Sequence, residues 1–576
     1  MKKMMLGNEA VARGAYEAGV KVVSSYPGTP STEITEFSAL YPEIKCEWAT
    51  NEKVAVETAF GASLGGVRAL SCMKHVGVNV AADPLFTAAY TGVRGGLVIV
   101  CADDPAMHSS QNEQDSRQIA RAAHIPMLEP SDCQEAKDMM KTAFWLSETY
   151  DTPVFVRMTT RLSHSRGVVE MAEREEVPDK PYQKDIAKYV MMPAMARKRH
   201  VLVEEREKRL QADANSLPIN REEMRGTEQG VICSGVVYEY VREALPNAST
   251  LKLGLTYPLP QEMMRSFAKK VQKLYVIEEL EGVIEQEAAA LGLSVTGKAL
   301  TGLQSELSVD RLRALFGKAS TEKQADLPAR PPVLCPGCPH RATFYALKRL
   351  GLTVFGDIGC YTLGAMAPLA AIDASLCMGG SIGMAFGAEK AKGRDFSKKA
   401  VAVIGDSTFL HSGMPSLLNA VYNGGNITVV LMDNRITAMT GHQQNPGMGY
   451  NIYGQPAFEV NFEHLCEAMG AHARTVDPMH CREMVAALKE ETARDGVSVI
   501  VAKSPCALLN KKHAPGVTVE NCRNCGACST IGCPAILKGQ DSVSIDASLC
   551  VGCGLCSQLC PHHALKDHQR GEEASC

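Results

Sequence analysis

Two cysteine runs near the C-terminus constrain this chain more than any other feature. Residues 522–534 read CRNCGACSTIGCP and residues 550–561 read CVGCGLCSQLCP, so nine of the 21 cysteines fall in the last 55 residues. In a reducing compartment such a dense set of thiols indicates metal binding rather than disulfide bonds. We therefore expect a cytoplasmic protein whose tail folds around metal centres.

The spacing within the runs favours iron–sulfur clusters. The second run is C-x2-C-x2-C-x3-C-P, and the first has one extra residue before its last cysteine. In such runs three thiolates bind one [4Fe–4S] cluster, and the fourth, before a proline, binds the other cluster. The predicted ligands are Cys522, Cys525, Cys528 and Cys560 for one cluster, and Cys533, Cys550, Cys553 and Cys556 for the other. Zinc knuckles are the alternative, but zinc sites usually present two separated C-x2-C pairs. The tail resembles bacterial two-cluster ferredoxins.

The composition excludes several classes of function. With 45% hydrophobic and 22% charged residues, the 576-residue chain matches an ordinary globular protein of several domains. A net charge of −4 provides no basic field for nucleic acid. No apolar run approaches the roughly 20 residues that span a bilayer, and the N-terminus lacks the apolar core of a signal peptide. We expect neither nucleic-acid nor membrane binding.

Alternating strand-like and helix-like segments divide the rest of the chain into α/β regions. They predict a doubly wound domain over 1–172, a charged and mostly helical connecting segment over 173–230, and a smaller α/β domain over 231–320. A third α/β domain over 334–510 has the predicted strands TVFGDIG, AVAVIGDS, ITVVLMDN and VSVIVAKSP, and the tail occupies 511–576.

Polar residues end two of the predicted strands in the third domain. VAVI runs into Gly405-Asp406-Ser407, and ITVVLM runs into Asp433-Asn434. In a parallel sheet both ends lie at the carboxyl edge, where α/β proteins bind ligands. Asp406 and Asn434 supply hard oxygens suited to Mg²⁺ bridging a diphosphate, and Gly405 permits close approach of the backbone. The alternative is a simple turn with an asparagine at a strand end.

The stretch from Gly405 to Asn434 resembles the thiamine-diphosphate motif, in which Gly-Asp-Gly is followed by a helix, a strand and a terminal Asn. Ser407 replaces the usual third glycine. The resemblance implies that Asp406, Asn434 and the backbone carbonyl of Ile436 hold Mg²⁺ and thiamine diphosphate.

Thiamine enzymes also need a glutamate on the aminopyrimidine ring, which makes the ring an acid and base. NEKVAVETAFGASLGG in the first domain resembles the glutamate-containing helix of pyruvate and 2-oxoacid:ferredoxin oxidoreductases, including the glycine nine residues later. By this resemblance Glu52 is the catalytic carboxylate. Glu57 is the competing choice, and its spacing predicts a residue on the helix surface.

Two further segments resemble substrate-binding parts of the same family. YPGTPS at Tyr26–Ser31 implies that Thr29 touches the substrate, and DDPAMHSSQNEQDSRQIA implies that Arg117 binds the substrate carboxylate. A guanidinium matches a carboxylate with two parallel hydrogen bonds. The alternative for Arg117 is an ordinary surface position.

Nearly the whole chain resembles the α subunits of indolepyruvate:ferredoxin oxidoreductases. GNEAVARGAYEAGV, MMPAMARKRH, CPGCPH and the fused ferredoxin tail carry the resemblance. It implies a pyrimidine-binding domain, a transketolase C-terminal-like middle domain and a diphosphate-binding domain. It also implies a smaller β subunit and the oxidative decarboxylation of aryl 2-oxoacids to aryl-acetyl-CoA and CO₂, with coenzyme A as acyl acceptor and ferredoxin as electron acceptor. A different 2-oxoacid, a non-oxidative decarboxylase and an electron-transfer subunit are the alternatives.

Four cysteines outside the tail predict a third cluster. By resemblance to the same family, Cys335, Cys338, Cys360 and Cys506 would hold a cluster close to thiamine diphosphate. Alternatively, the first two shape a turn and the others are small buried side chains, as free cysteines commonly are.

Overall fold

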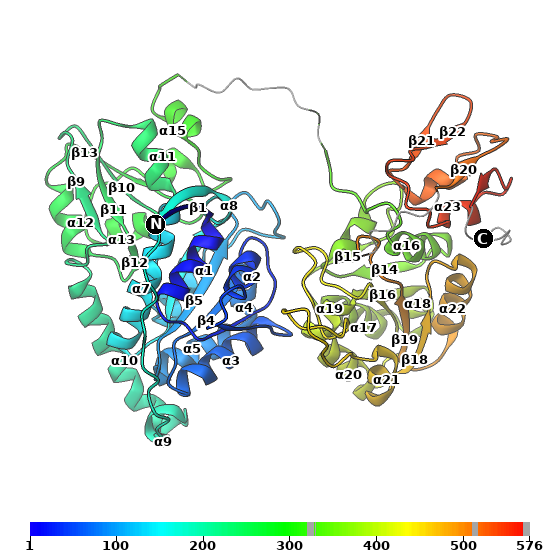
Figure 1. Cartoon of the computed structure of the whole chain (residues 1–576), viewed down its shortest axis with the longest axis horizontal. Coiled ribbons are helices and arrows are strands. Elements are labelled where there is room, and N and C mark those ends of the chain that lie inside the picture. Colours follow the sequence, from blue (N-terminus) through cyan, green and yellow to red (C-terminus); the bar gives the residue numbers. More distant parts are fainter. Residues whose placement is uncertain (320–327, 329, 510–515, 568–576) are drawn as a thin grey trace. The chain divides into compact units, whose positions relative to one another are not determined.

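A computed structural model describes residues 1–319, 328, 330–509 and 516–567 (Figure 1). The chain forms two compact units, Met1–Asp326 and Leu327–Cys576, each with its own sheets and cores. Within the described ranges, no helix combines the length and apolarity that a membrane span requires.

The first layer of unit 1 is a seven-stranded sheet in the order β12-β6-β7-β5-β4-β2-β3. All neighbours are parallel except β12 and β6. Helices cover both faces, and the central strands are accordingly buried along their whole length. The strands are β2 (Val22–Ser25), β3 (Lys45–Trp48), β4 (Ala69–Lys74), β5 (Leu97–Asp103), β6 (Met127–Leu128), β7 (Val154–Thr159) and β12 (Leu255–Tyr257).

The helices of this layer form the doubly wound arrangement that the sequence predicts. Helices α3 (Glu52–Leu64), α5 (Ala82–Thr91) and α6 (Ser116–Ala123) share one core with the sheet. Helix α1 (Gly7–Glu17) packs on α7 (Cys133–Tyr150), which in turn contacts β5 and β7. A short antiparallel pair, β1 (Lys2–Leu6) and β8 (Arg166–Glu170), joins the two ends of the region.

The middle region of unit 1 is a second, four-stranded sheet in the order β13-β10-β11-β9. Three strands are parallel, and β9 is antiparallel to β11. Strand β12, which follows β11 along the chain, pairs with β6 and so belongs to the seven-stranded sheet. The elements are β9 (Arg221–Glu223), β10 (Gln229–Ser234), β11 (Ser249–Leu253), β13 (Lys273–Ile277), α11 (Val237–Ala244), α12 (Gln261–Ala268), α13 (Val283–Ala290), α14 (Lys298–Thr301) and α15 (Val309–Leu315).

The charged connecting segment contains the short helix α9 (Ile186–Tyr189) and the long helix α10 (Pro193–Asp213). Only Val203, Arg206 and Leu210 of α10 are buried. Their spacing places them on one stripe, along which α10 lies against α5. The preceding residues, 172–185, have no regular structure.

Unit 2 contains a six-stranded, wholly parallel sheet in the order β15-β14-β16-β17-β19-β18. Strands β14 (Thr353–Gly356), β16 (Ala400–Gly405), β17 (Thr428–Asp433) and β19 (Ser498–Lys503) are the four that the sequence predicts. Strands β15 (Ala374–Ser375) and β18 (His472–Val476) were not predicted. The first has two residues, and the second alternates in exposure as an edge strand does.

Helices cover both faces of this sheet. Helices α16 (His340–Arg349) and α22 (Cys481–Ala493) share one core, while α17 (Gly380–Lys392), α20 (Met414–Tyr422) and α21 (Phe462–Ala468) share the other. The cysteine-rich tail packs on α16 and α22 through a further core that includes Ala342, Cys481, Ile531 and Leu559. The tail itself contains two antiparallel pairs, β20 (Thr518–Val519) with β23 (Leu565–Lys566) and β21 (Ile536–Lys538) with β22 (Val543–Ile545).

Candidate functional site

The predicted metal ligands of unit 2 lie at neighbouring strand ends. Gly405, the last residue of β16, is in register with Met432 of β17, so Asp406 and Asn434 follow at the same sheet edge. Both side chains are buried. Burial, together with the smaller effect of the neighbouring Asp433 charge, raises the pKa of Asp406 to about 7. Two neighbouring buried carboxyls thus lie where a bound cation would favour their ionisation.

The amide of Asn434 supplies a test of the magnesium assignment. One terminal atom of this amide lies 2.8 Å from the carbonyl oxygen of Ile436 and 3.3 Å from Asp406 Oδ1. With nitrogen at that position, the amide donates to both oxygens. With oxygen there, three oxygens from the three predicted ligands gather, which is the donor set that Mg²⁺ prefers. The residues present therefore fit the metal.

The motif glycine and serine have distinct local roles. A Cβ added to Gly405 would lie 2.5 Å from Cε1 of Tyr361, so no other residue fits there. The hydroxyl of Ser407 accepts a hydrogen bond of 2.9 Å from Thr437. Ser407 therefore ties the loop after β16 to the loop that contains Ile436.

The four cysteines of the predicted third cluster are brought together at this edge. Burial raises the pKa of the Cys360 thiol to about 11, and Cys506 and Cys335 add to the shift. Burial likewise raises the pKa of Cys338 to about 12, with contributions from Cys335 and Cys360. The backbone N–H of Cys506 donates to the carbonyl of Asn434 over 3.0 Å. The backbone of one member of this cysteine set is therefore hydrogen-bonded to the backbone of one residue of the candidate magnesium site.

In the tail, the thiols near Cys528 and near Cys556 are mainly those that the crossed prediction groups with each of them. Burial raises the pKa of Cys528, and Cys560 and Cys522 contribute. Burial also raises the pKa of Cys556, with contributions from Cys553, Cys533, Cys550 and the more distant Cys528. Cys525 is exposed.

A cavity in unit 2 is lined by all four cysteines predicted for the second tail cluster: Cys533, Cys550, Cys553 and Cys556. No three His, Cys, Asp or Glu side chains converge as ligands of a single ion would, in the part of the chain that the structure describes. A cubane cluster spaces its thiolates further apart, so a cavity walled by thiols suits a cluster better than an ion.

In unit 1, Glu52 is the first residue of α3 and is buried, with 4% of its surface exposed. Asn51 caps the helix by accepting a hydrogen bond from the Val54 N–H. A Cβ on Gly77 would lie 2.6 Å from Glu52 Oε1, so helix α4 (His75–Val80) packs directly on this carboxylate. Glu57 instead faces solvent and pairs with Lys53, as the sequence predicts.

Thr29 lies in the loop after β2 and is half-buried. The preceding Gly28 packs on Lys74, since an added Cβ would lie 3.1 Å from Lys74 Cβ. The Lys74 Nζ donates to the carbonyl of Ser109 over 2.5 Å, and the Ser109 hydroxyl donates to the Thr29 carbonyl over 3.4 Å. Thr29 and Lys74 therefore border one polar region at the carboxyl edge of the sheet.

Lys74 and His75 are polar residues that the sequence reasoning missed. Burial lowers the pKa of Lys74 to about 8. His75 is fully buried, and neither ring nitrogen has a hydrogen-bond partner among the described residues. The available signal was their position, because Lys74 is the first charged residue of β4 and His75 follows it directly. Lys74 and His75 thus lie at the start of helix α4, whose Gly77 packs on Glu52.

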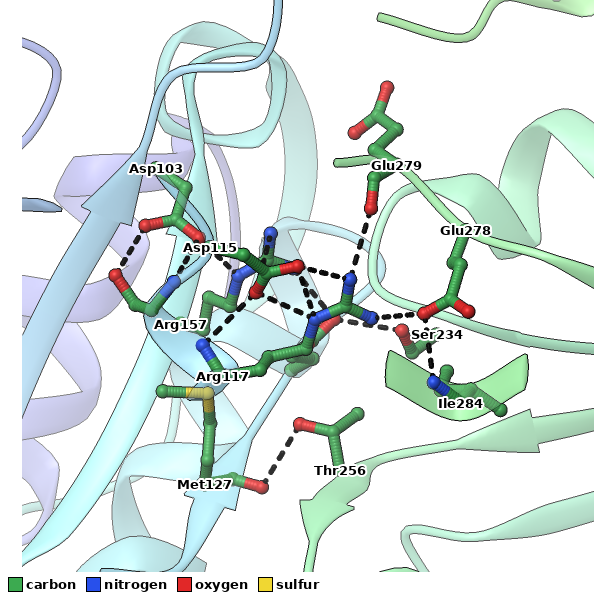
Figure 2. A network of polar contacts seen from close by, with 12 residues as sticks. Asp103, Asp115, Arg117, Met127, Arg157, Ser234, Thr256, Glu278, Glu279 and Ile284 are labelled. Carbon is green, nitrogen blue, oxygen red and sulfur yellow. Dashed lines mark hydrogen bonds and ion pairs between the residues drawn. The ribbon is translucent and has the colours of Figure 1, made fainter. Parts of the chain in front are cut away.

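The structure corrects the prediction for Arg117. Its side chain is 1% exposed rather than on the surface, and its nitrogens are occupied by protein groups (Figure 2). It bonds Asp115 through Nε and Nη2 and Glu278 through Nη1 (2.7 Å). Nη2 also donates to the carbonyls of Glu279 and Glu281. Arg117 joins α6 to the middle region and has no free edge for a substrate carboxylate.

Arg157 extends this cluster. Its Nε donates to Asp103 over 2.6 Å, and its Nη1 pairs with Glu129 over 3.1 Å. Ser234, at the end of β10, donates to the same Glu129 over 2.8 Å. The two arginines and their carboxylates thus form a buried network between the two sheets of unit 1 (Figure 2).

Comparisons with known proteins match these parts in order. Residues 13–224 match the family described as pyruvate flavodoxin/ferredoxin oxidoreductase, thiamine diP-bdg. Residues 357–502 match the thiamine pyrophosphate enzyme C-terminal TPP binding domain, and residues 543–566 match the 4Fe-4S binding domain. The indolepyruvate oxidoreductase subunit IorA of Archaeoglobus fulgidus is 41% identical, over 98% of this chain and 97% of its own length. The chain belongs to the IorA family.

Other relatives agree with this assignment. IorA of Methanothermobacter thermautotrophicus is 42% identical over 99% of this chain and 98% of its own length. The 2-oxoglutarate synthase subunit KorA of Methanocaldococcus jannaschii is 28% identical, over only 34% of this chain and 57% of its own length. The chain is an oxidoreductase with thiamine-diphosphate-binding domains and a [4Fe–4S]-binding domain.

Replacing Asp406 with alanine removes a carboxylate from the candidate magnesium site. We expect Asp406→Ala to lose Mg²⁺ and thiamine diphosphate together, because the metal anchors the diphosphate. Isothermal titration with Mg²⁺ and thiamine diphosphate measures the loss. Asp477→Ala is the control, since Asp477 also follows a strand of this sheet, β18, but caps only the Met479 N–H. Wild-type affinity in Asp406→Ala would contradict the assignment.

Replacing Arg117 tests its structural role. Arg117→Ala leaves Asp115 and Glu278 buried without their cation, which typically costs about 3–5 kcal/mol. We expect hydrogen exchange of the full chain to show faster exchange in α6 and around Glu278. In the control Arg121→Ala, on the same helix, an exposed side chain 4.0 Å from Glu287 is lost, at a cost of about 0–1 kcal/mol. Equal protection in the two variants would refute the role.

Proposed function

We propose that this chain is the thiamine subunit of an oxidoreductase that decarboxylates aryl 2-oxoacids such as indolepyruvate. The products are aryl-acetyl-CoA, CO₂ and two electrons, which leave through [4Fe–4S] clusters to ferredoxin. Coenzyme A is the acyl acceptor, and a smaller β subunit completes the enzyme. The full-length identity to IorA proteins supports the substrate class.

One contact carries the proposal, the hydrogen bond from the Cys506 N–H to the carbonyl of Asn434. Asn434 belongs to the candidate magnesium site, and Cys506 belongs to the set of four thiols. The first acceptor of electrons released at bound thiamine diphosphate would then lie next to the magnesium site, since Cys506 contacts Asn434. A non-oxidative decarboxylase has no need of such an arrangement.

Different residues of this chain would bind the cofactor, transfer the proton and orient the substrate. Asp406, Asn434 and the Ile436 carbonyl would hold Mg²⁺ and, through it, the diphosphate. Bound thiamine diphosphate supplies the nucleophilic carbon and the electron sink for decarboxylation. Glu52 would accept and return a proton at the aminopyrimidine ring, a task for which a buried carboxylate at a fixed position is suited. Thr29 would orient the substrate.

A substrate panel tests the proposal. The chain is co-expressed anaerobically with its β subunit and assayed with coenzyme A and a viologen dye. We expect dye reduction with indolepyruvate and other arylpyruvates to exceed that with pyruvate or 2-oxoglutarate. Preference for another 2-oxoacid, aldehyde as the main product, or absence of bound thiamine diphosphate would each overturn a specific part.

Glu52→Gln isolates the proton-transfer role. We expect the variant to retain its clusters and thiamine diphosphate but to lose about 10²–10⁴-fold in turnover, the usual contribution of a general acid–base group. Glu57→Gln is the control, because Glu57 lies on the same helix and only pairs with the exposed Lys53. Near-normal turnover in Glu52→Gln would assign the role to another carboxylate.

Iron analysis tests the third cluster. Three [4Fe–4S] clusters require about twelve irons per chain in anaerobically purified protein, and two require about eight. We expect Cys335→Ser to lose about four irons, while Cys233→Ser, a fully buried cysteine of unit 1, loses none. A value of eight that Cys335→Ser leaves unchanged would rule out this cluster.

A further inference from the structure

Arg341 is a buried cation held by backbone carbonyls rather than by acidic side chains. It is the second residue of α16, and 3% of its surface is exposed. Its nitrogens donate to four backbone carbonyls: Nε to Cys335 (3.0 Å), Nη1 to Ile531 (2.8 Å) and Gly532 (2.6 Å), and Nη2 to Leu334. Within the described residues it forms no ion pair with a carboxylate.

This placement is costly unless negative charge lies nearby. Carbonyl oxygens satisfy hydrogen bonds, but they do not balance the desolvated charge of a guanidinium. Burial lowers the pKa of Arg341, and the groups that oppose this lowering are the thiols of Cys533, Cys338, Cys335 and Cys553. Arg117, a deeply buried arginine of unit 1, has carboxylates in place of these thiols.

The four thiols belong to two different cysteine sets. Cys533 and Cys553 line the cavity of the second tail cluster, and Cys335 and Cys338 belong to the predicted third cluster. Pro336 and Gly337, between the latter two, line the same cavity. A Cβ on Gly337 would lie 2.3 Å from Cγ2 of Val551, so the CPGC loop lies directly on the second cysteine run. Arg341 therefore lies between two neighbouring cluster sites.

A [4Fe–4S] core with four thiolate ligands is an anion, and each added electron makes it more negative. Net charge, hydrogen bonding and burial set the reduction potential of such clusters. We propose that Arg341 is the shared counter-charge of these two clusters and raises the reduction potential of both. Arg341 is a positioning and tuning residue. It would stabilise the reduced states of the two clusters that accept electrons from the thiamine site. The part of the proposal that concerns the third cluster rests on the proposed function.

Potentiometry of the full chain with its β subunit tests the charge. Electron paramagnetic resonance follows each cluster during an anaerobic redox titration, with iron content measured on the same samples. We expect Arg341→Gln to retain its iron and to shift both couples to more negative potential. A tenfold change in the ratio of reduced to oxidised cluster corresponds to about 59 mV for one electron. Arg341→Lys keeps the charge and should stay close to wild type.

A matched control removes a distant arginine from the same unit. Arg394 pairs with Asp495 and donates to the carbonyl of Thr492, and neither partner is a cysteine. We expect Arg394→Gln to leave every potential unchanged.

Several outcomes would overturn the proposal. If Arg341→Gln retains its iron and its reduction potentials are unchanged, Arg341 has only a structural role, as a hydrogen-bond link between backbone segments. An equal shift in Arg341→Lys would exclude its charge as the cause. If Arg341→Gln loses iron, the measurement on Arg341→Lys decides. Wild-type reduction potentials in Arg341→Lys support the proposal, and a large negative shift in that variant refutes it. If the wild type holds only about eight irons, the prediction of a third cluster is wrong. The reduction potential of the second tail cluster alone then tests the role of Arg341.

Discussion

The packing of the cysteine tail on helices α16 and α22 is the constraint on which unit 2 depends. A tail of about 60 residues with four short strands buries little apolar surface of its own. Its core is completed by Ala342, Met479 and Cys481 from the diphosphate-binding region. Gln558 fixes the contact by bonding the Cys481 N–H and the Met479 carbonyl. The tail is thereby held against the loop that carries Cys335 and Cys338.

Two buried arginines differ in the groups that balance their positive charge. Arg117 is surrounded by carboxylates and links the two sheets of unit 1. Arg341 is surrounded by carbonyls and thiols and links the two cysteine sets of unit 2. A buried guanidinium requires negative charge, and the source of that charge separates a structural arginine from one that senses a redox centre. The residue type alone does not show which negative groups surround a buried arginine.

In both units, the candidate functional groups lie at the carboxyl ends of parallel strands. Asp406 and Asn434 follow β16 and β17, while Lys74 ends β4 and Thr29 lies in the loop after β2. Parallel strands present their loops and the helix N-termini to this edge, so polar groups gather there without disturbing the core. Cys506 follows β19 in the same way, which explains how a redox site can be built next to a metal site.

The sequence by itself determined the parts whose signal is local. Cysteine spacing indicated the clusters, apolar runs indicated four strands of unit 2, and Glu52 could be separated from Glu57 by its position on the helix. Tertiary structure alone decided the contacts between distant segments. Arg117 meets Glu278 some 160 residues away, and Arg341 meets the Ile531 carbonyl some 190 residues away. Spacing along a chain reports which side chains share a helix face or a strand end. It carries no information on which buried charge will neutralise another, because that depends on how separate layers pack.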